Sequence, residues 1–256
     1  MILAQLSDTH IVAKNNTHDK EKHRVESLKR CVDDINNLVP LPDAVIHTGD
    51  LTHNGLKEEF KIVFEILNSL KMPWYPTPGN KDRSINLIKN FSNKMTISPN
   101  HEFVLYAVDK HNVRLISMDS LSENSNKGNF TKEKLLLLDK LLLEEKEKPT
   151  AIFLHHPPFE VYTSIRSFFE YENEESVINF NKVISKHSQL RGIFCGHVHR
   201  DYNIVKDNLY THSVPPLAID LRYGSYPDNK SNSTLYYLYH YSNKDGFKPK
   251  QCWVNV

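Results

Sequence analysis

Five short polar motifs each follow an apolar run of the sequence, and they share the residue types Asp, Asn and His. In chain order they are Asp8-Thr9-His10, Gly49-Asp50, Gly79-Asn80-Lys81-Asp82, His155-His156-Pro157-Pro158 and Gly196-His197-Val198-His199. Carboxylate and amide oxygens and imidazole nitrogens are the donors that borderline-hard divalent or trivalent metal ions accept. The pattern therefore predicts a metal site in which Asp50 bridges two ions and the other donors gather around it.

The run that ends at Asp50 shows why such motifs need a partner. Val45 and Ile46 suit a buried strand, and a carboxylate at the tip of that strand is costly to desolvate unless a positive group meets it. The chain has only eight glycines, and three of them stand directly before proposed ligands: Gly49, Gly79 and Gly196. Because glycine is preferred where the backbone turns sharply or approaches another group closely, these positions indicate a crowded site.

Composition narrows the class of protein. With 256 residues, 39% hydrophobic and 25% charged, the chain fits one large domain better than two small ones. A net charge of +1 gives no overall field that points to nucleic acid or a membrane surface. No run reaches transmembrane length, the start lacks a signal-peptide pattern, and the three cysteines are odd in number and widely spaced. We therefore expect a cytoplasmic protein in a reducing compartment.

Hydrophobic periodicity places the motifs on strands joined by helices. Apolar residues recur every three or four positions over 22–38 and 56–70, which predicts two helices that alternate with the first three strands. Such alternation requires parallel crossovers. Further along we expect a loop over 11–20, a strand over 72–78, a hairpin over 103–118, helices at 84–91, 131–142 and 177–184, a substrate-facing lid in 159–175, and antiparallel strands at 202–205, 209–211 and 235–241.

Taken together, the five motifs resemble the signature of the calcineurin-like metallophosphoesterase superfamily, which reads D-x-H, G-D, G-N-H-[DE], H and G-H-x-H. The HHPP and GHVHR forms look most similar to the class III cyclic nucleotide phosphodiesterases and related glycerophosphodiesterases. The resemblance covers residues 3–200. It implies an α/β fold, a four-layer α-β-β-α sandwich of two mixed sheets, in a single domain 1–256 in which residues 201–256 complete the second sheet.

The resemblance also implies roles for individual residues. Asp8, His10 and His199 would hold one metal ion, and Asn80, His156 and His197 the other, with Asp50 bridging. His156 is chosen over His155 because the family ligand precedes the proline turn, which leaves His155 as a packed or supporting residue. Mn, Fe, Zn, Co and Mg, in divalent or mixed-valence pairs, all tolerate these donors. The implied reaction is attack of a metal-bridging hydroxide on a phosphodiester, with Asp50, Asn80, Lys81 and His156 as catalytic residues.

Lys81 is a departure, because the family usually has His after Gly-Asn. A lysine with its ordinary pKa of about 10.4 is a poor general acid near neutrality but a good fixed positive charge. We therefore expect Lys81 to contact substrate and to favour leaving groups that need little protonation. Arg200, directly after the last motif, is a second candidate for substrate binding.

Several alternatives stay open at this point. Lys81 favours a pyrophosphatase acting on a nucleotide-linked substrate, and some members of the fold serve as non-catalytic binding scaffolds. The full set of donors argues against a scaffold, and the absence of a basic stripe argues against a nuclease. The expected partner is a small-molecule phosphoester. No membrane span is expected, and the late strands and residues 159–175 are candidate surfaces for a homo-oligomer.

Overall fold

The apolar runs form the strands of two mixed sheets in a computed structural model that describes residues 1–13, 19–91, 103–163 and 167–256. The first sheet has the strand order β13-β12-β1-β2-β3. Its members are β1 (Ile2–Leu6), β2 (Ala44–His47), β3 (Trp74–Pro76), β12 (Ser233–Ser242) and β13 (Gly246–Asn255). β1, β2 and β3 run parallel, whereas β12 and β13 run antiparallel to their neighbours.

The second sheet has six strands in the order β10-β11-β9-β6-β5-β4. They are β4 (Leu105–Val108), β5 (Arg114–Met118), β6 (Thr150–Phe153), β9 (Leu190–Cys195), β10 (Tyr202–Lys206) and β11 (Leu209–Ser213). The four central strands β5, β6, β9 and β11 are parallel, and the two edge strands are antiparallel. A short hairpin of β7 (Val161–Tyr162) and β8 (Ser167–Phe168) stands apart from both sheets.

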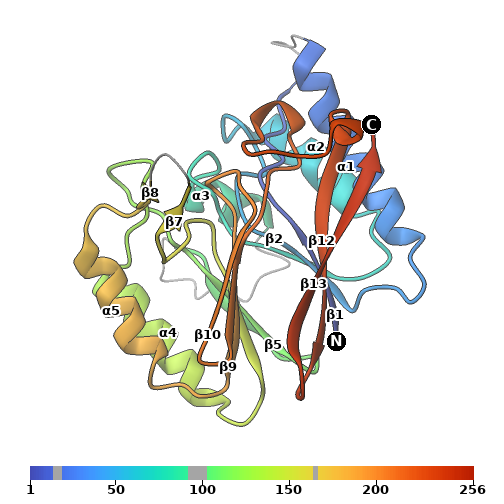
Figure 1. Cartoon of the computed structure of the whole chain (residues 1–256). Coiled ribbons are helices and arrows are strands. Elements are labelled where there is room, and N and C mark those ends of the chain that lie inside the picture. Colours follow the sequence, from blue (N-terminus) through green and yellow to red (C-terminus); the bar gives the residue numbers. More distant parts are fainter. Residues whose placement is uncertain (14–18, 92–102, 164–166) are drawn as a thin grey trace.

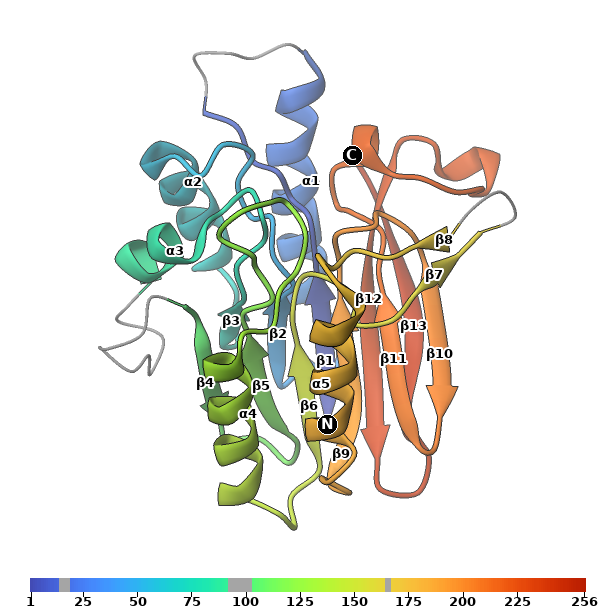
Figure 2. The same cartoon turned by 90° about the vertical axis from the view of Figure 1, so that its left-hand side faces the viewer.

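Helices cover the outer face of each sheet, as Figures 1 and 2 show. The helices are α1 (Asp19–Asn36), α2 (Lys57–Leu67), α3 (Ser84–Phe91), α4 (Lys132–Glu144) and α5 (Glu174–Ile184). Alternation along β6 shows how the layers are divided, since Ala151 and Phe153 pack in the core cluster that contains α1 and α2. Ile152 and Leu154 pack in the other cluster, with the leucines of α4 and Phe180 of α5. This arrangement is the expected four-layer α-β-β-α sandwich.

Residues 201–256 differ from the expectation that they complete the second sheet. β10 and β11 join the six-stranded sheet, but β12 pairs with β1, so the segment adds two strands to each sheet. β11 also runs parallel to β9, because the turn at Asp207-Asn208 returns the chain from the antiparallel edge strand. The strand β13 had no clear alternating pattern in the sequence. Residues 14–18 of the expected loop and 164–166 of the expected lid lie outside the described residues.

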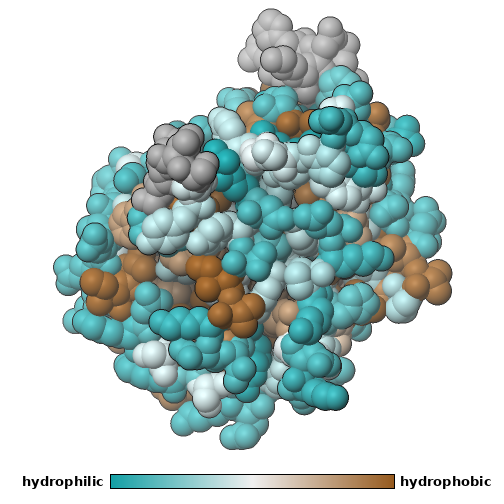
Figure 3. All heavy atoms as spheres, in the orientation of Figure 1, coloured by the Kyte–Doolittle hydropathy of each residue, from teal (hydrophilic) through white to brown (hydrophobic). Residues whose placement is uncertain are grey.

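On the face drawn in Figure 3, hydrophobic residues stand in small groups among hydrophilic ones. Among the described residues, no helix is both long enough and apolar enough to cross a membrane.

Candidate metal centre

The backbone at the strand ends is held in an unusual conformation. Five residues of the motifs that are not glycine have positive φ angles: Asp8 at 51°, His10 at 45°, Asp50 at 50°, His197 at 69° and His199 at 55°. Each such left-handed residue costs on the order of 1–2 kcal/mol, and strain of this kind persists where the surrounding structure fixes it, as at functional sites. Five of them in one place indicate a site built for a purpose other than stability.

Two glycines allow the strand ends to meet. A Cβ at Gly79 would overlap the amide nitrogen and the carboxylate of Asp50, and a Cβ at Gly196 would overlap Ser7 and the carboxylate of Asp8. Glycine is therefore required at both positions by close approach. This confirms that the two glycines belong to a crowded site.

One group of donors joins the first motif to the last. Nε2 of His199 lies 3.2 Å from Oδ1 of Asp8, and Nε2 of His10 lies 3.3 Å from Nε2 of His199. The three donor atoms lie within 4.8 Å of one another, which is the spacing that a shared metal ion requires. Oδ1 of Asp8 is buried and has no hydrogen-bond donor, so an ion here would supply its missing partner.

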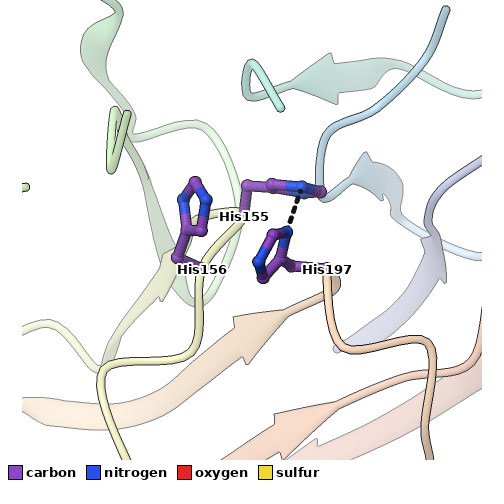
Figure 4. Close-up of side chains that lie close together, drawn as sticks. All are labelled: His155, His156 and His197. Carbon is purple, nitrogen blue, oxygen red and sulfur yellow. Dashed lines mark hydrogen bonds between the residues drawn. The ribbon is translucent and has the colours of Figure 1, made fainter. Parts of the chain in front are cut away.

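A second group gathers around Asn80. Its Oδ1 lies 3.0 Å from Nε2 of His155 and 3.1 Å from Nδ1 of His197, and these two ring nitrogens are 3.2 Å apart. Figure 4 shows the rings of His155 and His197 turned toward one another, with His156 beside them. Three polar atoms that converge so closely fit a cation between them.

Asp50 lies between the two groups. Its Oδ2 is 3.5 Å from Nε2 of His10 in the first group and 3.5 Å from Nε2 of His155 in the second. Its Oδ1 accepts a hydrogen bond of 2.8 Å from the backbone N–H of Lys81. The carboxylate thus faces both groups at once, which fits the bridging position expected from the sequence.

The tandem histidines occupy different surroundings. Nδ1 of His155 lies 2.8 Å from the Thr48 carbonyl, so this nitrogen carries the proton and Nε2 is left to face Asp50 and Asn80. Both ring nitrogens of His156 have other partners, the Ser120 hydroxyl at 2.9 Å and the Asn126 carbonyl at 2.9 Å. The choice of His156 over His155 as the ligand stays a prediction, and this geometry favours the reverse choice.

Hydrogen bonds from outside the centre orient two more imidazoles. Nε2 of His197 lies 3.2 Å from the Glu170 carboxylate, which directs Nδ1 toward Asn80. Nδ1 of His199 lies 2.9 Å from the Leu221 carbonyl, which directs Nε2 toward Asp8. Partners of this kind fix the tautomer and raise the basicity of a ligating imidazole.

Burial and opposite charge act against each other on the carboxylates. Burial raises the pKa of Asp8, but the close contact with His199 and the positive charge of that ring outweigh the effect of burial, so the pKa lies well below its ordinary value. Burial likewise raises the pKa of Asp50, but the positive charge of His155 outweighs the effect of burial, so the pKa of Asp50 also lies below its ordinary value. Although burial lowers the pKa of His155, the charge of Asp50 raises it to about 9. Two ionised carboxylates this deeply buried require positive charge beside them.

The remaining candidates lie at the edge of the centre. Lys81 is partly exposed, and its backbone reaches Asp50 as described above. Asp82 is fully buried and accepts hydrogen bonds from the backbone N–H groups of Leu51, Thr52 and Gly79, so it holds the loop in place. The guanidinium of Arg200 lies 5.2 Å from the centre of the Phe168 ring.

Comparison with known proteins decides the family. Residues 1–201 match the sequence model of calcineurin-like phosphoesterases. The chain belongs to this family. Members are metal-dependent hydrolases of phosphoric esters, and the donors described above fit divalent metal ions.

Relatives and solved structures agree with this assignment. A probable glycerophosphodiester phosphodiesterase GpdQ of Arcobacter nitrofigilis is 34% identical over 200 residues, which cover 78% of this chain and 72% of the relative. A 3',5'-cyclic-nucleotide phosphodiesterase of Nostoc is 26% identical over 208 residues, which cover 81% of this chain and 75% of the relative. A dimetal phosphatase structure from Danio rerio has the same fold, with a TM-score of 0.70 at 11% identity over 99% of this chain and 98% of that one.

Sequence reasoning about this phosphoesterase missed the supporting residues. Glu170 lies in an aromatic-acidic stretch that was assigned only to a lid, and nothing in its spacing links it to His197, 27 residues later. Ser120 and Asn126, which hold His156, were not singled out either: Ser120 directly follows the expected hairpin, and Asn126 lies in the polar stretch 122–129, which we expect to be a loop. A carboxylate between aromatic residues was the one signal that could have found Glu170.

Proposed function

We propose that this chain is a binuclear metal-dependent phosphodiesterase acting on diesters of the cyclic nucleotide or glycerophosphodiester type. The observation that supports this most strongly is the convergence of donors from the five distant motifs into two groups, with the carboxylate of Asp50 between the groups. The names of the two relatives, one a glycerophosphodiester phosphodiesterase and one a cyclic-nucleotide phosphodiesterase, support a diester as substrate.

The geometry supports one assignment of ligands to the two ions. Asp8, His10 and His199 would hold the first ion, Asn80, His155 and His197 the second, and Asp50 both. His155 replaces His156 in this assignment because its Nε2 is free to face the other donors. His156 would instead pack against the ring of His197, at 4.2 Å between ring centres, and keep that ligand in place.

When bound, two divalent ions here would activate water for attack on phosphorus and neutralise charge on the phosphoryl oxygens. The protein has to hold them at a fixed separation, which the rigid strand ends and the buried Asp50 carboxylate provide. Asn80 offers a neutral oxygen, and the neutral imidazoles limit the negative charge of the site. Lys81 adds a fixed positive charge at the edge, suited to hold a phosphoryl oxygen.

The test is a substrate screen of the purified chain with added Mn. Cyclic nucleotides, glycerophosphodiesters and nucleotide pyrophosphates are compared, with Asp50→Asn as the control. Hydrolysis of a diester by the parent and its loss in the control support the proposal. Activity that survives in Asp50→Asn would assign the reaction to a contaminant or to another site.

A pyrophosphatase is the second candidate, and Lys81 in place of the family His is the observation that favours it. A lysine ammonium is a poor general acid near neutral pH, so leaving groups that need little protonation, such as phosphate or an acidic alcohol, should be favoured. Rates on aryl phosphodiesters of graded leaving-group pKa are compared between the parent and Lys81→His. We expect a shallower slope in the variant, and an unchanged slope would remove Lys81 as the cause of this preference.

Two further expectations remain predictions. The cysteines Cys31, Cys195 and Cys252 are free thiols, which supports a reducing, cytoplasmic setting. The second is a homo-oligomer, which a measurement of the molecular mass in solution would test.

A further inference from the structure

A pocket of about 250 Å³ lies beside the metal centre. Tyr223 connects the two: its ring stacks on the ring of His199, with centres 6.2 Å apart and planes at 20°, and its backbone N–H donates to the His199 carbonyl at 3.1 Å. Arg200, the residue after this ligand, lines the same pocket. A group held there is therefore one aromatic ring away from a proposed metal ligand.

The lining of this pocket is rich in aromatic side chains. They are Tyr162, Tyr202, Tyr223, Tyr226 and Trp253. Tyr162 and Tyr223 are 58% and 57% exposed, so two large rings stand at its rim in contact with water. Arg222 holds two of the other rings, since its guanidinium lies 4.4 Å from the Tyr226 ring centre and 5.2 Å from that of Trp253. Fixed rings around an open pocket suit a ligand with an apolar, flat surface.

An aromatic pocket beside a carboxylate also suggests a cage for a quaternary ammonium group. The charges argue against that ligand. Asp201, the carboxylate of the pocket, is already paired: Oδ1 is 2.9 Å from Nε2 of His212, and Oδ2 accepts hydrogen bonds from Gln251 at 2.8 Å and from the Tyr237 hydroxyl. Three of the roughly four lone-pair sites of this carboxylate are thus already engaged, which leaves it little capacity to hold a cationic ligand.

Arg200 instead gives the pocket a positively charged side chain. The guanidinium of Arg200 lies 5.2 Å from the Phe168 ring centre and 5.3 Å from the Tyr223 ring centre, which fixes its plane. Its Nε is buried and has no hydrogen-bond acceptor among the residues that the structure describes. The charge of this guanidinium, which lines the pocket, repels a cationic ligand and favours one that offers an acceptor atom.

The origin of the walls gives a further argument. The family match ends at residue 201, and Tyr202, Tyr223, Tyr226, Gln251 and Trp253 all come later in the chain. The metal centre thus belongs to the shared part of the family, whereas most of the pocket lining, apart from residues 161–163, 200 and 201, comes from a part that the family model does not describe. Such a pocket is suited to select among substrates.

From these observations we propose that the pocket binds a planar aromatic group, neutral or bearing acceptor atoms, carried by one alcohol of the phosphodiester, with Arg200, Tyr223 and Trp253 as specificity-determining residues. This rests on the proposed phosphodiesterase function. The aromatic group can be a nucleobase or a simple aryl ring, since both present the same flat surface.

The test uses methyl phosphodiesters that differ only in the second group, with hydrolysis followed by ³¹P NMR. Benzyl methyl phosphate and cyclohexylmethyl methyl phosphate match in size and leaving-group character, so they isolate planarity. We expect kcat/KM to favour the benzyl ester by about three- to tenfold, the range that aromatic stacking supplies. Tyr223→Leu and Trp253→Leu should abolish the preference for the benzyl ester. Tyr241→Leu is the control, because Tyr241 lies on β12, the strand paired with β13 of Trp253, but outside the pocket, and it should keep the preference.

Two further substrates distinguish a nucleobase from a simple aryl ring and test the quaternary ammonium group as the alternative ligand. A methyl ester of thymidine 5′-phosphate replaces the aryl ring by a nucleobase, and the methyl ester of phosphocholine carries a quaternary ammonium group. The proposal is overturned if the benzyl and cyclohexylmethyl esters react equally in the parent, or if the choline ester is preferred over both.

A binding measurement keeps this test independent of catalysis. The chain has two tryptophans, and Trp74 is buried elsewhere, so Trp74→Phe leaves Trp253 as the single fluorescent reporter. Benzyl phosphate should change its emission at a concentration about three- to tenfold lower than cyclohexylmethyl phosphate does. If this difference appears and no ester is hydrolysed, the phosphodiesterase proposal fails and the pocket stands. If the two phosphates act alike, the pocket proposal fails.

Discussion

The metal centre and the aromatic pocket are neighbours built in different ways. At the metal centre every proposed ligand follows a strand of one of the sheets, and five of them are held at positive φ in a buried setting. The pocket is lined by β7, by the residues that lead into β10, by turns around Tyr223 and by the edge strand β13, and two of its rings are more than half exposed. The first region lies within the part that matches the family model, whereas most of the lining of the second comes after that match ends.

This difference indicates that the metal centre determines the reaction and that the aromatic pocket determines the choice of substrate. Fixing the positions of two cations needs donors whose backbone cannot move, so strain and close glycine contacts are accepted. Selecting an organic group needs only surface of the right shape and charge, which turns and an edge strand can supply. Substitutions at the centre should therefore change catalysis by orders of magnitude, and those in the pocket should change only the choice of substrate.

The largest effect is expected from Asp50→Asn. An amide in this position is neutral, so the oxygen that faces both donor groups loses the negative charge that would hold two cations, and kcat should fall roughly a thousandfold or more. Turnover of the best diester from the screen measures this, with circular dichroism as the check on folding. Asp207→Asn, in an exposed turn, is the control. A loss of less than tenfold would mean that the centre does not depend on a bridging carboxylate.

The tandem histidines give the next largest contrast. In His155→Ala the second donor group loses a ring nitrogen that lies 3.0 Å from Asn80, so the protein should retain about one equivalent less of metal after dialysis. In His156→Ala the metal content should be nearly unchanged, because both ring nitrogens are engaged elsewhere. Elemental analysis of the two variants decides between them. The reverse pattern would restore His156 as the ligand.

The sequence allowed prediction of the centre better than of anything around it. Asp8, Asp50 and Asn80 could be found because each ends a strand, and the carboxyl ends of parallel strands meet at one edge. The choice between His155 and His156 could not be made, since it depends on which ring nitrogen the Thr48 carbonyl and the Ser120 hydroxyl engage. Those partners come from other segments, and no spacing rule connects them.

The same limit applies to the fold. Both sheets followed from alternating strands and helices, but β12 pairs with β1 across more than 230 residues, as between Ile2 and His240. Local pattern predicts a strand and not its partner. The pocket could not be predicted from the sequence, because its rings come from separate turns and strands, one of which, β13, was not expected.

Glu170→Gln tests whether a residue outside the centre controls it. The carboxylate accepts a hydrogen bond from Nε2 of His197, and an amide would hold the ring less firmly and make Nδ1 less basic. Metal affinity of the second group should fall about 10- to 100-fold, as found for such partners in other metal sites. Isothermal titration with Mn measures it. Glu172→Gln, an exposed carboxylate two residues away that binds Ser122, should leave the affinity unchanged.

The smallest expected effect concerns the contact that joins the two regions. Arg24 of α1 is buried, donates to the His10 carbonyl at 3.1 Å, and forms two hydrogen bonds with Asp220 at 2.7 and 3.2 Å. Asp220 lies in a 3₁₀ turn, Ile219–Leu221, that leads directly to Tyr223. Asp220→Asn leaves the guanidinium without its counter-charge, and the free energy of unfolding at pH 7 should fall by about 1–3 kcal/mol.

The pH dependence of that difference identifies its cause. Burial raises the pKa of Asp220, but the hydrogen bond and charge of Arg24 outweigh it, so the folded pKa lies below the unfolded value of about 3.9. The stabilisation is therefore complete above pH of about 5 and is lost as the pH falls through the folded pKa. Urea unfolding of parent and variant should show a constant gap at pH 5–8 that narrows below pH of about 4. If the difference in the free energy of unfolding between parent and variant is undiminished at pH 3, the destabilisation comes from lost packing. The contact between Arg24 and Asp220 would then stabilise the protein through its fit and not through its charges.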